Sequence, residues 1–440
     1  MGAIADALTE AGHDVTLLMP IMDEEQKNKI GVKLTKNVIK VSPDPRAAEI
    51  MKYKAELLGK VWTIQPTVSG MMEMAGNMTT VFRYQCERVL NDDLLMKKFQ
   101  DEKFDVGIAE VISICAFGIF EVAKIPASIA TVSVAYKDVA SAAIGEPINP
   151  SFVPGAYSNA GDHMNFVDRV KNAVELLLGR KLFANIFESE MSAFKEKFGQ
   201  NFEGYNELIA KASYVMTNSN PYLDYPRPML HKTVCIGGIA VSVDSKKNKL
   251  SEEWDAILNE RSSTVLVSFG TMAKAVYMPD KYINSLLTVF ENMPNTTFIM
   301  KYEEDNSELA KHLPNVHLSA WFPQNALLAD SRLTAFMTHG GLGSTTELAH
   351  QGKPAVLVPL FADQSRNAHM LAKHGGGIVL TKYDLESPEK IQESLLTIIN
   401  DGRYAENAKR LSQMLLNQPI SAKQLLIRHS EYVAKFRTIV

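Results

Sequence analysis

The chain has 440 residues, of which 46% are hydrophobic and 22% are charged, and its formal net charge is −4. These values are ordinary for a globular protein, and the length predicts two or three domains that each bury their own core. A negative net charge, without a basic stripe or an arginine-rich segment, leaves no electrostatic case for a nucleic-acid partner.

The chain opens with a helical pattern. Residues Met1 to Ala11 carry apolar side chains on one helical face and the pattern stops at Gly12, after which Asp14 to Met19 is expected to form a strand. A doubly wound domain normally begins with a strand, and none precedes this helix in the sequence. The first strand of the first domain is therefore expected to be missing.

Further strand and helix patterns alternate along the first half of the chain. An apolar run, Phe104 to Ala109, reads as a strand with Glu110 at its carboxyl end. A stretch rich in Pro, Ser and Asn at 147–161 reads as a loop, and Phe166 to Phe198 as a long amphipathic helix. Alternation of this kind predicts a doubly wound α/β sheet.

The sharpest change in composition lies at residues 241–251, VSVDSKKNKLS, which are polar and lysine-rich between two apolar regions. It predicts an interdomain linker, with an N-terminal domain at 1–240 and a C-terminal domain at 252–415. An amphipathic helix within 416–440 then ends the chain. No run of 18 apolar residues occurs, so no membrane span is predicted.

The segment 321–364 is the most informative part of the sequence. A buried strand, Leu333 to Thr338, leads into the glycine-rich turn at 339–343, and Ser344 reads as the N-cap of a helix that closes at Gly352. A strand at 355–360 completes the unit. A helix that starts after a glycine-rich turn directs free N–H groups and its positive dipole end at the turn, which suits an anion such as phosphate.

Each residue of this segment also has a structural interpretation. His339 alone is compatible with a buried structural histidine, Glu347 with the second half of a capping box begun by Ser344, and Trp321 with a core position. Only the joint pattern favours a ligand site, because ligands of such sheets bind at the carboxyl ends of the strands. His339 and the Asp363-Gln364 pair both fall there.

The joint pattern resembles the signature of the UDP-glycosyltransferases, the family of animal UDP-glucuronosyltransferases and plant secondary-product glycosyltransferases. The matching positions are Trp321, Gln324, His339, Gly340, Gly341, Ser344, Glu347, Pro359, Asp363 and Gln364. A small-residue loop that includes Gly270 and Thr271 also matches the family. The amino-acid sequence of the first half resembles nematode members of the family. The family often has Asn where this chain has Gly343, so a side-chain contact is missing there.

The resemblance implies the GT-B fold, in which two Rossmann-like domains face each other across a cleft, with the acceptor on the first domain and UDP-sugar on the second. It implies that Trp321 stacks on uracil, that Gln324 holds the base edge and that Glu347 holds the ribose. The diphosphate falls to His339, Ser344 and the turn amides, including those of Gly340 and Gly341. Asp363 and Gln364 hold the transferred sugar, and Gly270 and Thr271 face the nucleotide.

The reaction implied is an inverting, metal-independent transfer of a hexose or glucuronic acid to a hydroxyl of a small lipophilic acceptor. UDP-sugar is the co-substrate and no cofactor is expected. A His acts as base and a carboxylate, here Glu110, supports it. The family's His lies before the position of Met1, so it is absent from this chain, and His13 is expected to be structural.

Two interpretations of different class stay open. The chain is a glycosyltransferase, or it is a donor-binding pseudoenzyme or fragment that lacks the catalytic His. The resemblance further implies a detoxification role on the lumenal side of the endoplasmic reticulum membrane, with homo-oligomers among the expected assemblies. Membrane attachment is expected only through a C-terminal span that this sequence lacks, as it lacks a signal peptide.

Cysteine and histidine spacing gives no metal or disulfide signature. The three cysteines, Cys86, Cys115 and Cys235, are far apart and odd in number, so they are expected to be buried structural residues rather than a disulfide framework or a metal cluster. No H-E-x-x-H or D-x-D occurs, and neither a P-loop nor a G-x-G-x-x-G motif is present. These absences argue against a metal site, a P-loop NTPase and an NAD dehydrogenase.

Overall fold

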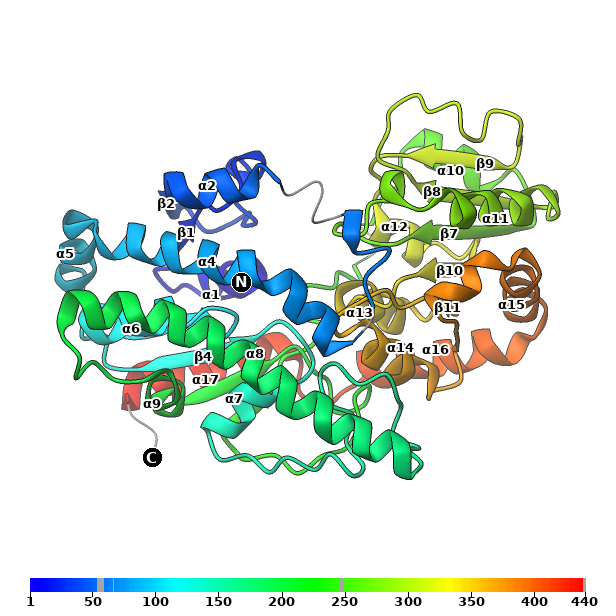
Figure 1. The fold of residues 1–440 in the computed structure, drawn as a ribbon. Coiled ribbons are helices and arrows are strands. Elements are labelled where there is room, and N and C mark those ends of the chain that lie inside the picture. Colours follow the sequence, from blue (N-terminus) through cyan, green and yellow to red (C-terminus); the bar gives the residue numbers. More distant parts are fainter. Residues whose placement is uncertain (54–58, 66, 245–247, 438–440) are drawn as a thin grey trace.

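The computed structural model describes residues 1–440 apart from 54–58, 66, 245–247 and 438–440. Two α/β domains built on parallel sheets lie side by side, the N-terminal one on the left of Figure 1 and the C-terminal one on the right. The predicted GT-B arrangement of two Rossmann-like domains is confirmed. Residues 245–247 of the predicted linker lie outside the described residues, and the rest of 241–251 forms no helix or strand.

The C-terminal domain is built on one parallel six-stranded sheet in the order β12-β11-β10-β7-β8-β9. Its strands are β7 (Ser263–Ser268), β8 (Thr296–Lys301), β9 (Val316–Ser319), β10 (Leu333–Thr338), β11 (Ala355–Leu357) and β12 (Gly377–Val379). The order steps outward from β7 on one side and from β10 on the other. The direction of winding therefore reverses between β7 and β10, and such a reversal is where doubly wound sheets bind nucleotides.

Helices cover both faces of this sheet. They are α10 (Glu252–Leu258), α11 (Asp280–Glu291), α12 (Gln324–Ala329), α13 (Leu342–Gln351), α14 (Gln364–Ala372), α15 (Pro388–Asn400) and α16 (Gly402–Leu416), with short 3₁₀ turns η2 (Ala275–Tyr277) and η3 (Lys382–Glu386). Two apolar clusters, one on each face, enclose the central strands, whose side chains are almost wholly buried. Central strands buried on both faces explain the continuous apolar runs that marked β7 and β10 in the sequence.

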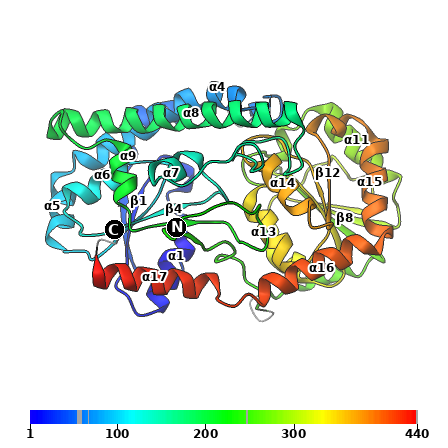
Figure 2. The same ribbon diagram turned by 90° about the horizontal axis from the view of Figure 1, so that it is seen from below.

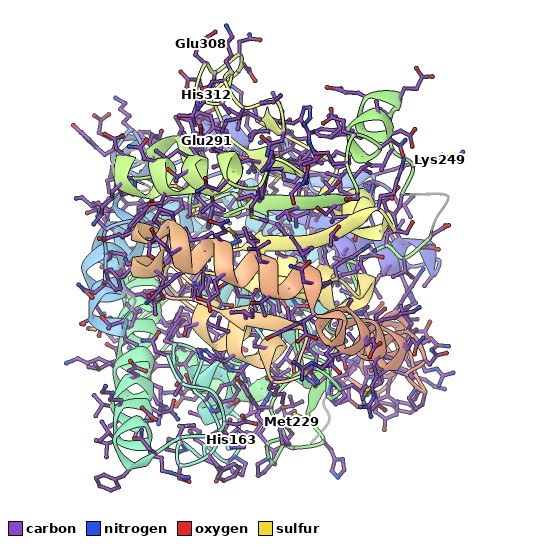
Figure 3. All side chains as sticks on the ribbon, turned by 90° about the vertical axis from the view of Figure 1, so that its right-hand side faces the viewer. His163, Met229, Lys249, Glu291, Glu308 and His312 are labelled. Atoms are coloured by element: carbon purple, nitrogen blue, oxygen red, sulfur yellow. A yellow bond between two sulfur atoms is a disulfide. The ribbon has the colours of Figure 1, made fainter. Side chains whose placement is uncertain are left out.

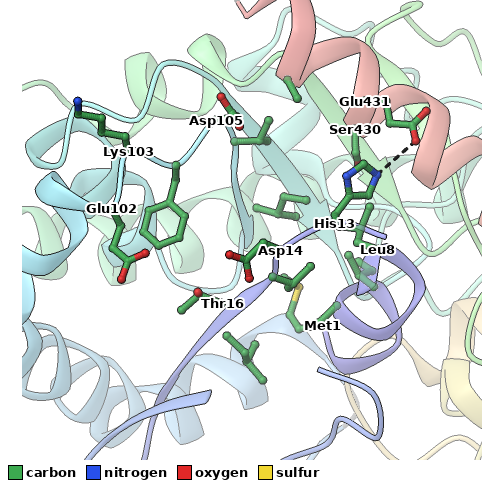
Figure 4. Close-up of a pocket in the computed structure, with 18 residues that line it drawn as sticks. Met1, Leu8, His13, Asp14, Thr16, Glu102, Lys103, Asp105, Ser430 and Glu431 are labelled. Carbon is green, nitrogen blue, oxygen red and sulfur yellow. Dashed lines mark hydrogen bonds and ion pairs between the residues drawn. The ribbon is translucent and has the colours of Figure 1, made fainter. Parts of the chain in front are cut away.

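The N-terminal sheet is divided. One part pairs β1 (Thr16–Pro20) with β2 (Asn37–Val41), and the other is a four-stranded parallel sheet of β3 (Gly107–Glu110), β4 (Ser128–Val132), β5 (Tyr214–Thr217) and β6 (Thr233–Cys235). A cavity of about 340 Å³ lies between them, lined by Thr16 and Leu17 of β1 and by Ile108 of β3. No described strand fills this space, and α1 and the C-terminal helix close part of it (Figure 4).

The remaining elements surround these two sheets. They are α1 (Gly2–Glu10), η1 (Glu24–Gln26), α2 (Pro45–Met51), α4 (Val68–Leu90), α5 (Asp93–Asp101), α6 (Cys115–Val122), α7 (Asp138–Ala143), α8 (Phe166–Phe198) and α9 (Tyr205–Lys211). The last helix, α17 (Ala422–Phe436), returns from the C-terminal domain to pack Leu426 and Val433 against Ile4 and Leu8 of α1. Figure 2 shows α17 beside α1 under the N-terminal domain.

Further contacts tie the two halves together. Trp62, from the N-terminal half, is buried against Phe269 with ring centroids 5.2 Å apart, and its indole N–H donates to the Lys274 carbonyl at 2.9 Å. The Arg366 guanidinium pairs with Asp224 at 2.7 Å, and both side chains are almost fully buried. The boundaries 1–240, 252–415 and 416–440 stay a prediction, because segments of one half pack into the other.

The cysteine prediction was right about the burial of Cys86 and Cys115 but wrong about their bonding, and Cys235 is only half-buried. Cys86 of α4 and Cys115 at the start of α6 form a disulfide with Cα atoms 5.8 Å apart, while Cys235 is free. An odd number of cysteines is also compatible with one disulfide and one free thiol. Sequence separation carried no information here, because the two helices meet only through packing in the N-terminal core.

Most predicted elements occur with shifted ends. The α8 helix spans the predicted range Phe166–Phe198, with an Asn165–Asp168 capping box at its start. The β3 strand begins three residues later than expected, and β11 ends at Leu357 rather than at residue 360. Within the described ranges, none of the helices is both long and apolar enough to cross a bilayer.

Candidate donor site

The residues predicted to bind the nucleotide gather where the C-terminal sheet reverses its winding. Gly270 follows β7 and His339 follows β10, and these two strands are paired directly. A Cβ atom placed on Gly270, whose φ is +88°, would lie 2.6 Å from the His339 ring, and one on Gly341 would lie 2.4 Å from His339 Nε2. Glycine is required at both positions because the imidazole lies between the two backbone segments.

The turn leads directly into α13. The helix begins at Leu342 with Gly341 as its N-cap, and the Thr345 N–H already donates to the Gly341 carbonyl at 2.9 Å. The prediction that Ser344 is the N-cap was therefore wrong, and Ser344 lies inside the first turn. The helix ends as predicted at Gly352, which is left-handed. The turn and His339 thus lie at the positive end of α13, as an anion site requires.

Burial keeps His339 neutral. The pKa of its imidazole is lowered from 6.5 to about 4, mainly by desolvation and also by the Lys301 charge, while a hydrogen bond with the Ser268 backbone partly opposes the shift. Thr338 Oγ1 lies 3.3 Å from His339 Nδ1. A neutral imidazole has one N–H to donate, so His339 at neutral pH is able to donate a hydrogen bond to a phosphate oxygen without carrying charge.

Gln324 connects the start of α12 to α13. Its side-chain amide donates to Ser344 Oγ at 3.1 Å and to Glu347 Oε2 at 2.5 Å. Glu347 is therefore not the partner of a capping box, and burial raises the pKa of its carboxyl group while the Gln324 bond opposes the rise. Three residues predicted to share one ligand are thus in direct contact before any ligand binds.

Trp321 is not a core residue. Its side chain is 76% exposed, which is unusual for an indole, and the Lys301 ammonium lies 5.8 Å from the ring centroid. Lys301 also donates to the Gly270 carbonyl at 2.8 Å and pairs with Glu303 at 3.4 Å. No motif pointed to Lys301, which connects the small-residue loop after β7 to Trp321 after β9.

Asp363 and Gln364 begin α14, next to the glycine-rich turn. Asn367 donates to Asp363 Oδ2 at 2.8 Å, and burial raises the pKa of the Asp363 carboxyl group. The Gln364 side-chain oxygen accepts from the backbone N–H groups of Leu360 and Phe361 at 2.8 and 3.1 Å, so it holds the loop after β11 in place. Asp363 is the freer of the two for a sugar hydroxyl.

Glu110 lies at the carboxyl end of β3, on the other domain, and accepts a hydrogen bond from the Ser133 N–H at 3.1 Å. Lys137, which sequence reasoning missed, links the two sides. Its ammonium lies 3.6 Å above the Phe183 ring, and burial lowers its pKa to about 7 against the opposing charges of Glu110, Asp138 and Asp363. Lys137 thus feels the charges of Glu110 on the N-terminal domain and of Asp363 on the C-terminal domain.

His13 lies far from this region. It precedes β1, at the amino ends of the strands, and its Nε2 lies 3.2 Å from Glu431 Oε1 of α17, as Figure 4 shows. Glu110 lies at the opposite, carboxyl edge of the sheet. Within the described residues, no group of three His, Cys, Asp or Glu side chains is placed to hold a metal ion.

Solved structures share this architecture. A glycosyltransferase of kitacinnamycin superposes with a TM-score of 0.61 at 17% identity, over 98% of this chain and 94% of the other. The spinosyn forosaminyltransferase SpnP gives a TM-score of 0.60 at 17% identity, with the same coverage. At this identity the likeness concerns the fold alone. The fold of this chain is therefore the GT-B arrangement.

Sequence relatives name the family. The family model for UDP-glucoronosyl and UDP-glucosyl transferases matches residues 1–438, and the chain belongs to this family. The protein ugt-56 of Caenorhabditis elegans is 30% identical over 429 residues, covering 96% of this chain and 80% of its own length. Human UDP-glucuronosyltransferase 1A3 is 25% identical over 437 residues, covering 99% of this chain and 80% of its own. The predicted family is confirmed.

Proposed function

We propose that the protein binds a UDP-sugar at the end of β10 and transfers the hexose or glucuronic acid to a hydroxyl group of a small lipophilic acceptor. The observation that carries the donor half of this proposal is the neutral His339 imidazole, held between Gly270 and Gly341 at the start of α13. Hydrogen-bond donors fixed there stabilise the charge that develops on the UDP leaving group.

The surrounding residues fit the parts of a nucleotide sugar. The exposed Trp321 ring offers a stacking surface for uracil, and the Gln324–Glu347 pair offers an amide and a carboxylate to the base edge and ribose. Ser344 and the amides of Gly340 and Gly341 suit the diphosphate. Asp363, with Gln364 holding its loop, suits sugar hydroxyls, and Thr271 lies exposed beside Gly270.

We place the acceptor on the N-terminal domain, near Glu110. In an inverting, metal-independent transfer, a base removes the proton of the acceptor hydroxyl and a carboxylate orients that base. Glu110 lies at the carboxyl edge of its sheet and suits the second role. We do not assign the role of base to His13, because it lies beside Glu431 at the opposite edge of the sheet.

One observation favours a second candidate, a protein that binds donor without turnover. Within the part of the chain that the structure describes, Glu110 accepts a bond from the Ser133 backbone and has no histidine partner. A glycosyltransferase domain without its base would retain UDP-sugar affinity and lose nearly all of its rate.

The test combines binding with turnover. Calorimetric titration with UDP should give saturable binding to the unmodified chain, and His339→Ala should abolish it. His312→Ala, on the exposed rim of the same domain labelled in Figure 3, is the matched control and should bind as the unmodified chain does. Failure of UDP to bind the unmodified chain would overturn the proposal. Release of UDP from UDP-glucose or UDP-glucuronate with a phenolic acceptor would decide for the transferase over the second candidate.

We also propose that the protein works in the endoplasmic reticulum lumen, attached to the membrane, in the clearance of lipophilic compounds. The Cys86–Cys115 disulfide supports an oxidising compartment, because such bonds are rare in the cytosol. Alkylation in denaturant of the protein as isolated from cells, followed by mass spectrometry, should leave Cys86 and Cys115 unmodified until a reductant is added. Free thiols at both positions would contradict this location.

A further inference from the structure

Lys137 is a buried cation on the loop that follows β4. It is the N-cap residue of α7 and is only 8% exposed. Its ammonium lies 3.6 Å above the Phe183 ring, and the Tyr157 ring stacks on Phe183 with centroids 6.4 Å apart. An aromatic face attracts a cation but leaves the three N–H donors of an ammonium without strong acceptors. Burial of such a group is costly, and an anion that accepts those hydrogen bonds would offset the cost.

The carboxylates around Lys137 do not pair with it. The charges of Glu110, Asp138 and Asp363 all act on the ammonium. Within the described residues, however, no carboxylate oxygen lies within 4 Å of it and no group accepts a hydrogen bond from it. These acids therefore keep the site favourable for a cation without saturating that cation.

Two other cations next to the donor site already have carboxylate partners. Arg366 of α14 pairs with Asp224 at 2.7 Å, and Lys301 of β8 pairs with Glu303 at 3.4 Å. Their charges are committed to the protein itself. Lys137, unlike these two residues, keeps its charge and its donors available for a ligand.

The loop that carries Lys137 reaches the sugar end of the donor site. The Tyr136 ring lies 5.9 Å from the guanidinium of Arg366, which is in the first turn of α14, and Asp363 is the N-cap residue of that helix. Burial shifts Lys137 and Asp363 towards their neutral forms, but the Asp363 charge raises the pKa of Lys137 and the Lys137 charge lowers the pKa of Asp363. Asp363 stays partly exposed. A sugar whose hydroxyls bind Asp363 would therefore lie beside the ammonium.

We propose that the Lys137 ammonium binds a carboxylate on the transferred sugar, so that the chain prefers a UDP-uronate, such as UDP-glucuronate, to a neutral UDP-hexose. The inference rests on the proposed function, because it needs the donor site at the end of β10. A sugar carboxylate would accept charge-assisted hydrogen bonds, which are about twice as strong as neutral ones. The hydroxymethyl group of a hexose brings no charge to the buried ammonium. Lys137 makes or breaks no bond, and it acts as a specificity-determining residue.

The experiment is calorimetric titration of the full chain with UDP, UDP-glucose and UDP-glucuronate. The unmodified chain should bind UDP-glucuronate about tenfold or more tighter than UDP-glucose, as one hydrogen bond to a charged group provides. Lys137→Met, which keeps the length of the side chain and removes its charge, should lose this preference. Lys137→Gln is a second neutral replacement and should lose it too. Lys181→Met, at an exposed lysine of α8, is the matched control and should keep the preference.

Titration with UDP itself separates this inference from the proposed function. UDP carries no sugar, so its affinity reports whether each variant is folded with its donor site intact. If UDP fails to bind the unmodified chain, both proposals fail. If UDP binds but UDP-glucuronate binds no tighter than UDP-glucose, the donor site stands and the role of Lys137 is overturned. A preference that survives in both neutral variants would also overturn it, because the carboxylate would then have another partner.

Discussion

The two domains differ in the continuity of their sheets. The C-terminal domain has six strands in one parallel sheet, while the N-terminal strands divide into a pair and a group of four with a cavity of about 340 Å³ between them. The places to compare are the point between β7 and β10, where the C-terminal strand order reverses, and the gap between β1 and β3. In the C-terminal domain β7 and β10 are bonded at that place and position His339, whereas in the N-terminal domain β1 and β3 are separated there.

The difference shows how a complete sheet creates a site. Direct pairing of β7 with β10 brings Gly270 within contact distance of His339, which leaves the imidazole one fixed position. Around the N-terminal cavity the side chains come from α1, β1, β3 and α17, and a two-stranded sheet such as β1–β2 is marginally stable by itself (Figure 4). We therefore expect the donor half of the site to be preorganised and the β1–β2 region to be the least stable part of the fold.

The largest expected effect comes from breaking the buried Arg366–Asp224 ion pair, which links the N-terminal half to the C-terminal domain. Arg366→Met leaves Asp224 as an unpaired, almost fully buried carboxylate, and breaking such a pair costs about 3–5 kcal/mol. Urea unfolding should show this loss. Arg403→Met, which breaks an exposed pair with Asp401, should leave the free energy of unfolding almost unchanged, because solvent screens exposed ion pairs. An equal loss of unfolding free energy in the two variants would show that the Arg366–Asp224 ion pair contributes no more to stability than an exposed pair.

Loss of the disulfide should affect the N-terminal domain alone, because both cysteines lie in that domain. Replacing Cys86 and Cys115 together by Ser should destabilise the N-terminal domain by about 2–4 kcal/mol, because the cross-link restricts the unfolded chain. UDP affinity should not change, since the donor site lies on the other sheet. Calorimetry with and without UDP measures both. A fall in UDP affinity that matches the loss of stability would mean that the donor site depends on the N-terminal core.

The pH dependence of stability tests the burial of His339. Its pKa is lowered from 6.5 to about 4, so below pH 6.5 the unfolded chain binds a proton that the folded chain does not. The free energy of unfolding should therefore fall as pH drops from about 6.5 towards about 4, and His339→Gln should remove that part of the fall. An NMR titration of the His339 ring with a midpoint near 6.5 would contradict the account. His350 and His374 shift in the same direction, which is why the variant is needed.

The smallest effect concerns Gly343. A Cβ atom there meets nothing within 4 Å, so Gly343→Asn has room, and a new hydrogen bond to UDP should tighten binding by about 1 kcal/mol. Gly341→Ala is the contrasting variant, because its Cβ would meet His339 Nε2 and displace the ring. Calorimetric titration with UDP should show tighter binding for Gly343→Asn and weaker binding for Gly341→Ala. Weaker binding of UDP by Gly343→Asn would show that UDP binding requires the space beside Gly343 to stay empty.

Local sequence predicted what depends on local structure. The segment 321–364 holds most of the donor residues within one strand, turn and helix, and the long helix α8 was predicted from its periodicity with both ends correct. Errors arose where a residue distant in the sequence determines the local structure. The Ser344 hydroxyl accepts from Gln324 instead of capping α13, and the loop after β11 is held by Gln364, which ends the strand early.

Contacts between distant segments could not be predicted. Lys301, Lys137 and Arg366 have no motif, and each gains its role from residues on other elements. The Cys86–Cys115 pair likewise depends on tertiary packing, since α4 and α6 both pack against α8. The division of the N-terminal sheet, its cavity and the closure of that cavity by α17 were not predicted, because they depend on contacts between distant segments.

Hydrogen–deuterium exchange with and without UDP tests the central claim most directly, because it maps the ligand onto the backbone. Segments 268–272, 321–324 and 339–347 should become protected when UDP is added, and β1 and β2 should exchange fastest among the strands and stay unchanged. Protection confined to the N-terminal domain, or none at 339–347, would contradict the assignment of the donor site to the end of β10.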